Sequence, residues 1–194
     1  MIRALLLIID PTNTWERIEN SQHGIARVFF VSILPLLLVT SAIESYGLMT
    51  WGRERGLEHK VKPISTDLLV RYEGASLLLS LVLLFVGAWL LKMIAEGFHR
   101  RHAYRDAFAT TAYSLSPLFL CRALNAFPGI NLWIPWGIGI FLALAVLYRG
   151  IPRVLKPDPP SALGLYMLAS LMFLVATGLA NFLQILVLDE KILA

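Results

Sequence analysis

The stretch GASLLLSLVLLFVGAWLLKMI, residues 74–94, decides the fold class of this chain, and its one charged side chain is Lys92. A helix needs about 20 mostly apolar residues to cross the hydrocarbon core of a bilayer. Strands of a membrane barrel alternate apolar and polar residues, and this run does not. The stretch therefore predicts a membrane-spanning helix.

The whole chain has the composition of an integral membrane protein. It has 194 residues, of which 57% are hydrophobic and 15% charged, against about 25% charged in an average soluble domain. Four further runs are long and apolar enough to span, at 26–48, 107–127, 130–147 and 163–188. The sequence predicts an all-α, polytopic bundle of five transmembrane helices in one domain, 26–188, followed by a tail, 189–194. Cys121 is the one cysteine, so no disulfide forms within the chain.

The N-terminal segment, 1–25, is apolar at its start but too short there to span. Asn13 and Glu16 have the spacing of a capping pair, and Trp15 and Ile18 share one face of the helix that would follow. These features predict a short interfacial helical segment on the membrane surface. A frayed tail is the alternative.

The orientation follows from lysine and arginine in the loops. With a cytoplasmic N-terminus, ten of these residues face inward and six face outward. The positive-inside rule therefore predicts an N-terminus inside and a C-terminus outside. The tryptophans are expected as anchors at the ends of the helices: Trp15, Trp51, Trp89, Trp133 and Trp136.

Polar residues fall at one depth inside the predicted bundle. In this orientation Glu44, Arg122 and Asn181 each lie about 7 to 9 Å outward from the middle of their helix. Asn125 and Gln184 lie about one turn further out. An unpaired charge at this depth costs several kcal/mol, so we expect Arg122 to pair with Glu44 and Asn181 to bridge them. The alternative is that Arg122 reaches the outer head groups. The cluster serves either packing or a substrate or ion site.

The loops contain a helix cap, prolines and basic residues. Ser65, Thr66 or Asp67 is expected to cap the second span early. The segment 149–162, RGIPRVLKPDPPSA, is basic and rich in proline, and is expected to be extended and cytoplasmic. The basic residues expected to meet anionic lipid or an acidic partner are Arg100, Arg101, Arg105, Arg149, Arg153 and Lys156.

Motifs for catalysis and cofactors are missing from the sequence. It contains no H-E-x-x-H, no G-x-S-x-G and no glycine-rich phosphate loop. His99 and His102 have i, i+3 spacing but arginines as neighbours, which is a poor metal site. We expect no enzyme activity, catalytic residue, cofactor or metal. The net charge of +4 is spread over loops, a pattern that suits lipid head groups and not nucleic acid.

Three segments form a recognisable pattern: DPTNTWERI at 10–18, AYSLSPLFL at 112–120 and LYRGIPRVLKPDPPSALGLYMLAS at 147–170. Together they resemble the YIP family of Ypt/Rab-interacting membrane proteins, and its bacterial branch most closely. The resemblance implies a five-helix bundle with a cytoplasmic N-terminus. It also implies structural roles for the family-pattern positions Tyr113, Pro117, Gly150 and Pro152. Eukaryotic members bind Rab-type GTPases and carry a longer N-terminal region with an acidic-tyrosine-glycine-proline motif. This chain lacks that motif, so GTPase binding is not expected.

Two functions fit these observations. The first is a non-enzymatic membrane protein that acts through lipid, a membrane-protein partner or a second copy of itself in membrane organisation or trafficking-like processes. The second is a small transporter or channel built on Glu44, Arg122 and Asn181. The expected location is a bacterial inner membrane.

Overall fold

The computed structural model describes residues 14–18, 24–55, 60–62, 64–98, 103–158 and 160–188. Several sequence predictions fall outside these residues. They concern Asn13, His99, Arg100, Arg101, His102 and the tail 189–194.

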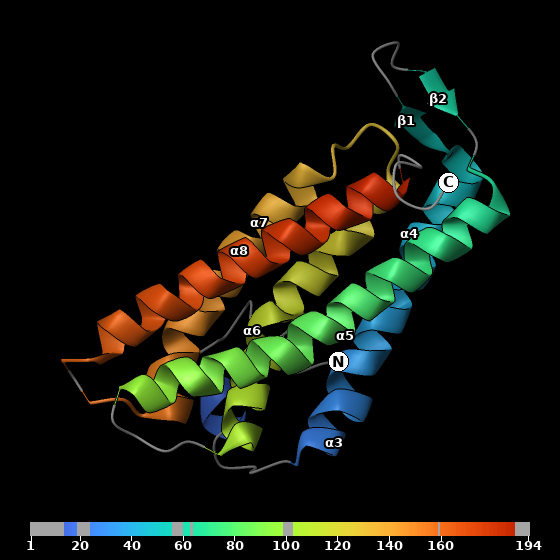
Figure 1. Ribbon diagram of the computed structural model, residues 1–194. Helices are drawn as coiled ribbons and strands as arrows, with labels where there is room; N and C mark the ends of the chain where they lie inside the picture. The colour runs from blue at the N-terminus through green and yellow to red at the C-terminus, as the bar shows by residue number, and fades with distance from the viewer. Residues whose placement is uncertain are drawn as a thin grey trace.

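The described helices form five rods (Figure 1). The first joins α3 (Ile25–Arg27), the π-helical η1 (Val28–Ile33) and α4 (Leu34–Trp51). The second is α5 (Thr66–Gly97), and the third joins α6 (Tyr104–Cys121) to the 3₁₀ segment η2 (Arg122–Ala126). The fourth joins α7 (Trp133–Gly150) to the π-helical η3 (Ile151–Leu155), and the fifth is α8 (Ala162–Leu188).

A small hairpin departs from the all-α prediction. The strands β1 (Arg53–Arg55) and β2 (Lys60–Lys62) pair antiparallel between the first and second rods, with Arg53 opposite Lys62. We call the end of the bundle next to this hairpin the hairpin end; α4 ends there and α5 begins there (Figure 1). We call the opposite end, where α5 ends and α6 begins, the loop end.

The second rod begins earlier than the predicted span at 74–94. Ser65 caps α5, because its hydroxyl accepts a hydrogen bond of 3.3 Å from the backbone N–H of Leu68. Of the three predicted caps, Ser65 is therefore the one used. The early start places residues 66–73 inside the helix, with consequences for the site described below.

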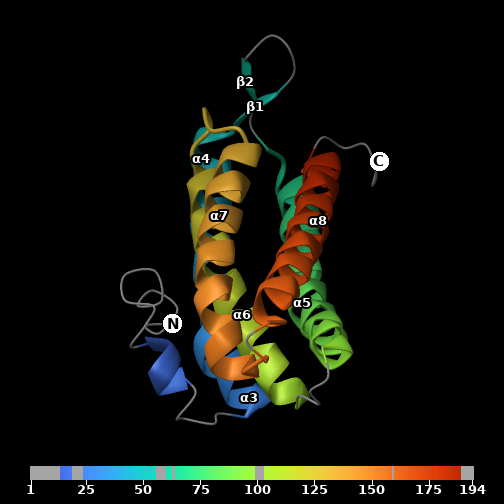
Figure 2. The same cartoon turned by 90° about the vertical axis from the view of Figure 1, so that its left-hand side faces the viewer.

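The helix α6 forms the centre of the bundle. Residues 107–117 are all buried, and α6 contacts α4, α5 and α7. In Figure 2 it lies behind α7, between the first rod and α5. Two of its hydroxyl groups bond within the helix: Thr110 donates to the backbone oxygen of Asp106 (2.8 Å), and Ser116 donates to that of Tyr113 (2.6 Å). The polar face of α6 is therefore shielded by the other rods.

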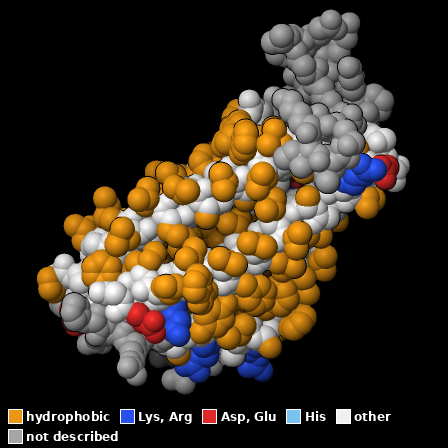
Figure 3. Space-filling model, viewed as in Figure 1, with side chains coloured by type: hydrophobic (Ala, Val, Ile, Leu, Met, Phe, Trp, Pro, Cys, Tyr) orange, Lys and Arg blue, Asp and Glu red, His pale blue; other side chains and the backbone are white. Residues whose placement is uncertain are grey.

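The outer faces of the bundle are apolar. Exposed large hydrophobic side chains include Phe30, Phe141 and Leu171, which are 58–73% exposed. Figure 3 shows hydrophobic side chains spread over α8 and α5, with charged side chains gathered at the two ends. A continuous apolar surface of this kind suits contact with lipid.

Within the described residues, four segments are long and apolar enough to cross a membrane: Ile25–Trp51, Thr66–Gly97, Trp133–Leu155 and Ala162–Leu188. The predicted third span, 107–127, is not among them, so the count of five is not confirmed. Its α-helix ends at Cys121, and its first turn carries Arg105 and Asp106. The physical reason is burial: α6 packs against protein and needs fewer apolar side chains than a helix that faces lipid.

The N-terminal segment is predicted to lie on the membrane surface, and its described residues, 14–18, pack against the bundle. These residues form one helical turn whose Trp15 is fully buried. The indole N–H of Trp15 donates a hydrogen bond of 3.2 Å to the backbone oxygen of Val146 in α7. A side chain on Gly150 would lie 2.5 Å from the Trp15 ring. The missing side chain of Gly150 therefore makes room for Trp15.

The basic loop 149–162 is also less extended than predicted. Residues 149 and 150 end α7, and η3 continues the same rod to Leu155. The rod stops at Lys156, whose backbone is left-handed with φ 43°. The proline-rich segment that remains is short.

Candidate functional site

Two glutamates and one arginine form a buried ionic cluster near the hairpin end. Glu44 comes from α4, Glu73 from α5 and Arg122 from η2. Arg122 Nε donates to Glu44 Oε2, and Arg122 Nη2 donates to Glu73 Oε2. The side chains of Arg122, Glu44 and Glu73 are 7%, 0% and 13% exposed. The guanidinium thus lies between two carboxylates, and the formal charge of the cluster is −1.

Neighbouring donors complete the hydrogen bonds of Glu44. Its Oε1 accepts from the hydroxyl of Tyr72 at 2.6 Å and from Asn125 Nδ2 at 3.1 Å. With Arg122, three donors meet this carboxylate. A carboxylate so fully bonded can remain buried without the large penalty of an isolated charge.

The carboxylate of Glu73 is bonded in the same way. Its Oε1 accepts from Ser45 Oγ at 2.9 Å, and its Oε2 accepts from Ser41 Oγ. Ser41, Glu44 and Ser45 stand at i, i+3 and i+4 on α4, so they share one helix face. That face of α4 therefore builds the site for both acids.

A close helix contact positions Arg122. A side chain on Gly47 would lie 2.4 Å from the backbone oxygen of Ala126. Gly47 therefore lets η2 approach the backbone of α4 directly. Glu44 is one turn before Gly47, which brings it beside Arg122 and Asn125.

The structure changes the predicted cluster in two respects. Arg122 and Glu44 lie together, and Asn125 joins them, but Asn181 bonds to neither, so the bridging role predicted for Asn181 is wrong. Arg122 instead binds a second carboxylate, that of Glu73, which the sequence did not predict. The signal for Glu73 is the Ser41 and Ser45 pair, which flanks Glu44 with two more donors on the same face.

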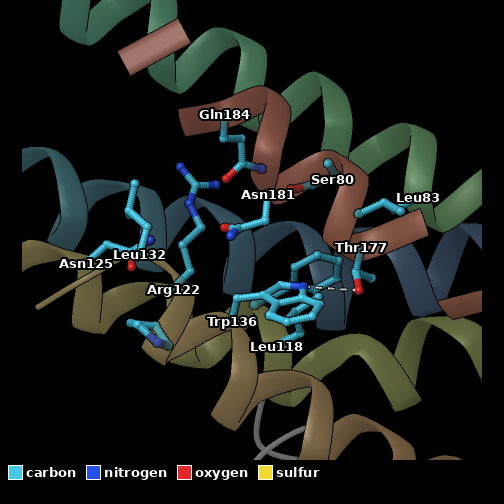
Figure 4. A pocket seen from close by; sticks show the side chains of 13 residues that line it. Ser80, Leu83, Leu118, Arg122, Asn125, Leu132, Trp136, Thr177, Asn181 and Gln184 are labelled. Carbon is cyan, nitrogen blue, oxygen red and sulfur yellow. Dashed lines mark hydrogen bonds between the residues drawn. The ribbon is translucent and has the colours of Figure 1, made fainter. Parts of the chain in front are cut away.

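A polar cavity of about 50 Å³ adjoins Arg122. It lies between the middle of the bundle and the hairpin end, and Figure 4 shows the side chains around it. Its polar lining residues are Ser80, Arg122, Asn125, Thr177, Asn181 and Gln184. Trp136 also lines it and donates a hydrogen bond of 3.3 Å from Nε1 to Thr177 Oγ1, drawn dashed in Figure 4. The predicted residues Asn181 and Gln184 therefore lie at this cavity.

A second cavity, of about 490 Å³, lies at the loop end between α7, η3 and α8. We call it the arginine–tyrosine cavity, because Arg149, Arg153, Tyr148 and Tyr166 line it. The two tyrosine rings meet edge to face with centroids 5.1 Å apart. Arg153 Nη1 donates to Glu16 Oε1 at 2.6 Å, which ties the N-terminal turn to the rim of the cavity.

The other predicted basic contacts are dispersed. Arg105 pairs with its neighbour Asp106 at 3.3 Å, and Arg149 is exposed. Lys156 occupies the left-handed position after η3. Of the four predicted basic residues that the structure describes, Arg149 and Arg153 line one cavity.

The four family-pattern positions lie around the Trp15 contact and in the central helix. Tyr113 is buried and meets Trp15 edge to face, with ring centroids 6.3 Å apart. Pro117 is inside α6, and Pro152 is in η3. Trp15 also packs on Gly150, so Tyr113 and Gly150 hold the N-terminal turn to the bundle.

Comparison with known proteins gives one family. Residues 5–180 match the family model described as Yip1 domain. No curated protein and no solved structure matches the chain.

Proposed function

Because this chain belongs to the Yip1 domain family, we propose that it is a non-enzymatic membrane protein that acts by binding lipid or protein partners in membrane organisation. The resemblance drawn from its sequence motifs is confirmed by the match over 5–180, and the apolar helices make it an integral membrane protein. Our proposal adds a bacterial inner membrane, with the loop end in the cytoplasm and the hairpin end outside.

The proposal includes five crossings, with α6 as the enclosed fifth. The rod formed by α6 and η2 covers residues 104–126, which at about 1.5 Å per residue gives roughly 34 Å. This length matches a hydrocarbon core of about 30 Å. The rod also runs between the same two ends of the bundle as its neighbours (Figure 1).

The arginine–tyrosine cavity is the observation that carries the proposal. Guanidinium groups bind phosphate through paired hydrogen bonds, and tyrosine favours the membrane–water interface. Arg149 and Arg153 offer the first property at the rim, and Tyr148 and Tyr166 offer the second. We propose that this cavity receives the head group of an anionic phospholipid.

The transporter alternative is less favoured. The charges of Glu44, Glu73 and Arg122 are bonded to one another and to neighbouring side chains. The polar cavity beside them is small and is lined only by residues between the middle of the bundle and the hairpin end. A through-path would need a further opening toward the loop end.

A lipid-retention experiment tests the proposal. The purified protein is placed in nanodiscs of phosphatidylcholine with or without phosphatidylglycerol, and retained lipid is counted by native mass spectrometry. Each arginine near the surface contributes about 1 kcal/mol to anionic lipid binding. Arg149→Gln with Arg153→Gln should therefore weaken phosphatidylglycerol binding roughly 30-fold.

Arg71→Gln is the matched control, because Arg71 is an exposed arginine at the hairpin end, paired with Asp67 at 2.9 Å. It should leave retention unchanged. Equal retention by the double variant and the unmodified protein would refute the lipid role of the cavity.

A further inference from the structure

Two hydrogen-bond donors at the polar cavity lack a partner within the described residues. They are Arg122 Nη1 and Asn181 Nδ2. Both side chains are more than nine-tenths buried, with exposures of 7% and 8%, and both line the cavity. The carbonyl oxygen of Asn125, Oδ1, is a third such atom at the same cavity. A buried polar atom left without a partner costs about 1 to 3 kcal/mol, so the three point to an occupant.

The surrounding charges restrict what this occupant is. An anion would face the donors but would also meet the net charge of −1 on Glu44, Glu73 and Arg122. A metal cation would meet the N–H groups of Arg122 and Asn181, which repel it. A small neutral molecule that both accepts and donates hydrogen bonds satisfies all three atoms, and water is the smallest. A cavity of about 50 Å³ holds on the order of three or four waters, since each needs about 10–15 Å³.

The residues that line the cavity differ between its hairpin-end side and its inner side. Gln184 is about one turn nearer to the hairpin end than Asn181 on α8, and it is half-buried. Figure 4 shows the two side chains one above the other along α8, beside Arg122. Toward the middle of the bundle the lining becomes Leu83, Leu118 and the ring of Trp136. Asn125 and Gln184 line the hairpin-end side together with the apolar Leu132 and Pro135, and the ring of Trp136 forms a floor on the inner side.

The floor is held in place by a short chain of hydrogen bonds. Trp136 Nε1 donates to Thr177 Oγ1, and Thr177 Oγ1 donates to the backbone oxygen of Phe173 at 2.7 Å. The indole is thus fixed across the inner side of the cavity.

We infer that the polar cavity is a water-filled vestibule that admits the aqueous phase from the hairpin end as far as Arg122 and stops at Trp136. The buried ionic cluster is then hydrated from one side of the membrane only. This inference is independent of the lipid site at the loop end, because the two share no lining residue.

Thiol labelling tests the vestibule. Single cysteines at Asn181→Cys and Gln184→Cys are made in a Cys121→Ala background, and the full chain is treated in vesicles with a small, charged, impermeant methanethiosulfonate. Such reagents attack the thiolate, which forms in water and not in lipid or a dry core. Both cysteines should react at least tenfold faster than the controls, and from one face of the membrane only.

Two control positions represent the alternatives to a wet cavity, a site that faces lipid and a site in a dry core. Phe182→Cys lies on the same helix at an apolar, 48% exposed site. Ser76→Cys lies at a fully buried site that does not line the cavity. If the cysteine at 181 reacts as slowly as these two, the cavity is dry and the inference is wrong, whatever the reactivity at 184. If position 184 alone fails to fold, the result at 181 decides.

Discussion

Removing the cation of the buried ionic cluster should destabilise the protein strongly. In Arg122→Leu, the carboxylates of Glu44 and Glu73 lose the guanidinium that both of them bind. Glu44 is fully buried and Glu73 is 13% exposed, so solvent compensates little. Breaking a buried ion pair by removing one partner costs about 3 to 5 kcal/mol. We expect a loss of that size.

The loss can be measured by reversible unfolding of the purified protein in mixed micelles. Arg71→Leu is the matched control, because its partner Asp67 is 74% exposed and such a surface pair contributes at most about 1 kcal/mol. A loss in Arg122→Leu no larger than that in Arg71→Leu would refute the buried cluster.

The charge balance of the cluster predicts a smaller loss when one of its two acids is removed. Glu44→Gln leaves one carboxylate for one guanidinium, so it should cost less, about 1.5 to 3 kcal/mol for the lost bond to a charged group. Combining Glu44→Gln with Arg122→Leu should cost less than the sum of the two, since the variant then holds a single acid, Glu73. Strict additivity would show that Glu44 and Arg122 do not interact.

Two packing predictions follow from glycine contacts. Gly47→Ala should destabilise the protein by about 1 to 3 kcal/mol, because its Cβ would lie 2.4 Å from the backbone oxygen of Ala126. Gly74→Ala has open space around the new Cβ, so in the same unfolding assay it should stabilise the protein by about 0.5 to 1 kcal/mol. Gly150→Ala should displace Trp15 and speed limited proteolysis of the N-terminal turn relative to Gly74→Ala; equal cleavage rates would contradict the contact.

Most of the helices can be predicted from the hydropathy of the sequence. The run 74–94 predicts its own helix because a bilayer admits only apolar faces and satisfied backbone groups. The central helix α6 is harder to recognise, since burial against protein permits Thr110, Thr111, Ser114 and Ser116 where lipid would not. The hydropathy of α6 is therefore a weaker indication of a membrane-spanning helix than that of the helices that face lipid.

The sequence predicts how deep the site residues lie along their helices, but not which neighbour each side chain faces. Position along a helix fixed the common depth of Glu44 and Arg122, because the rise per residue is constant. The rotation of α8 about its axis depends on packing, so the sequence could not tell that Asn181 faces a cavity and not Glu44. Glu73 was missed because the span was taken to begin at Gly74, one residue later.

Trp15 shows a similar limit. A tryptophan near the end of a span is usually an interfacial anchor, and this expectation failed because Gly150 leaves a space that the indole fills. Such a space depends on two residues far apart in the chain, and one sequence does not reveal the pairing.

Labelling on either side of α6 tests the central claim, the five crossings, most directly. Ala103 and Gly129 are exposed positions that flank the rod of α6 and η2 at its two ends. Each is changed to cysteine in a Cys121→Ala background and treated in intact cells with an impermeant thiol reagent. We predict that the cysteine at 129 is labelled from outside and that the cysteine at 103 is labelled only after the membrane is permeabilised. Labelling of both from the same side would show that α6 does not cross and would contradict the account.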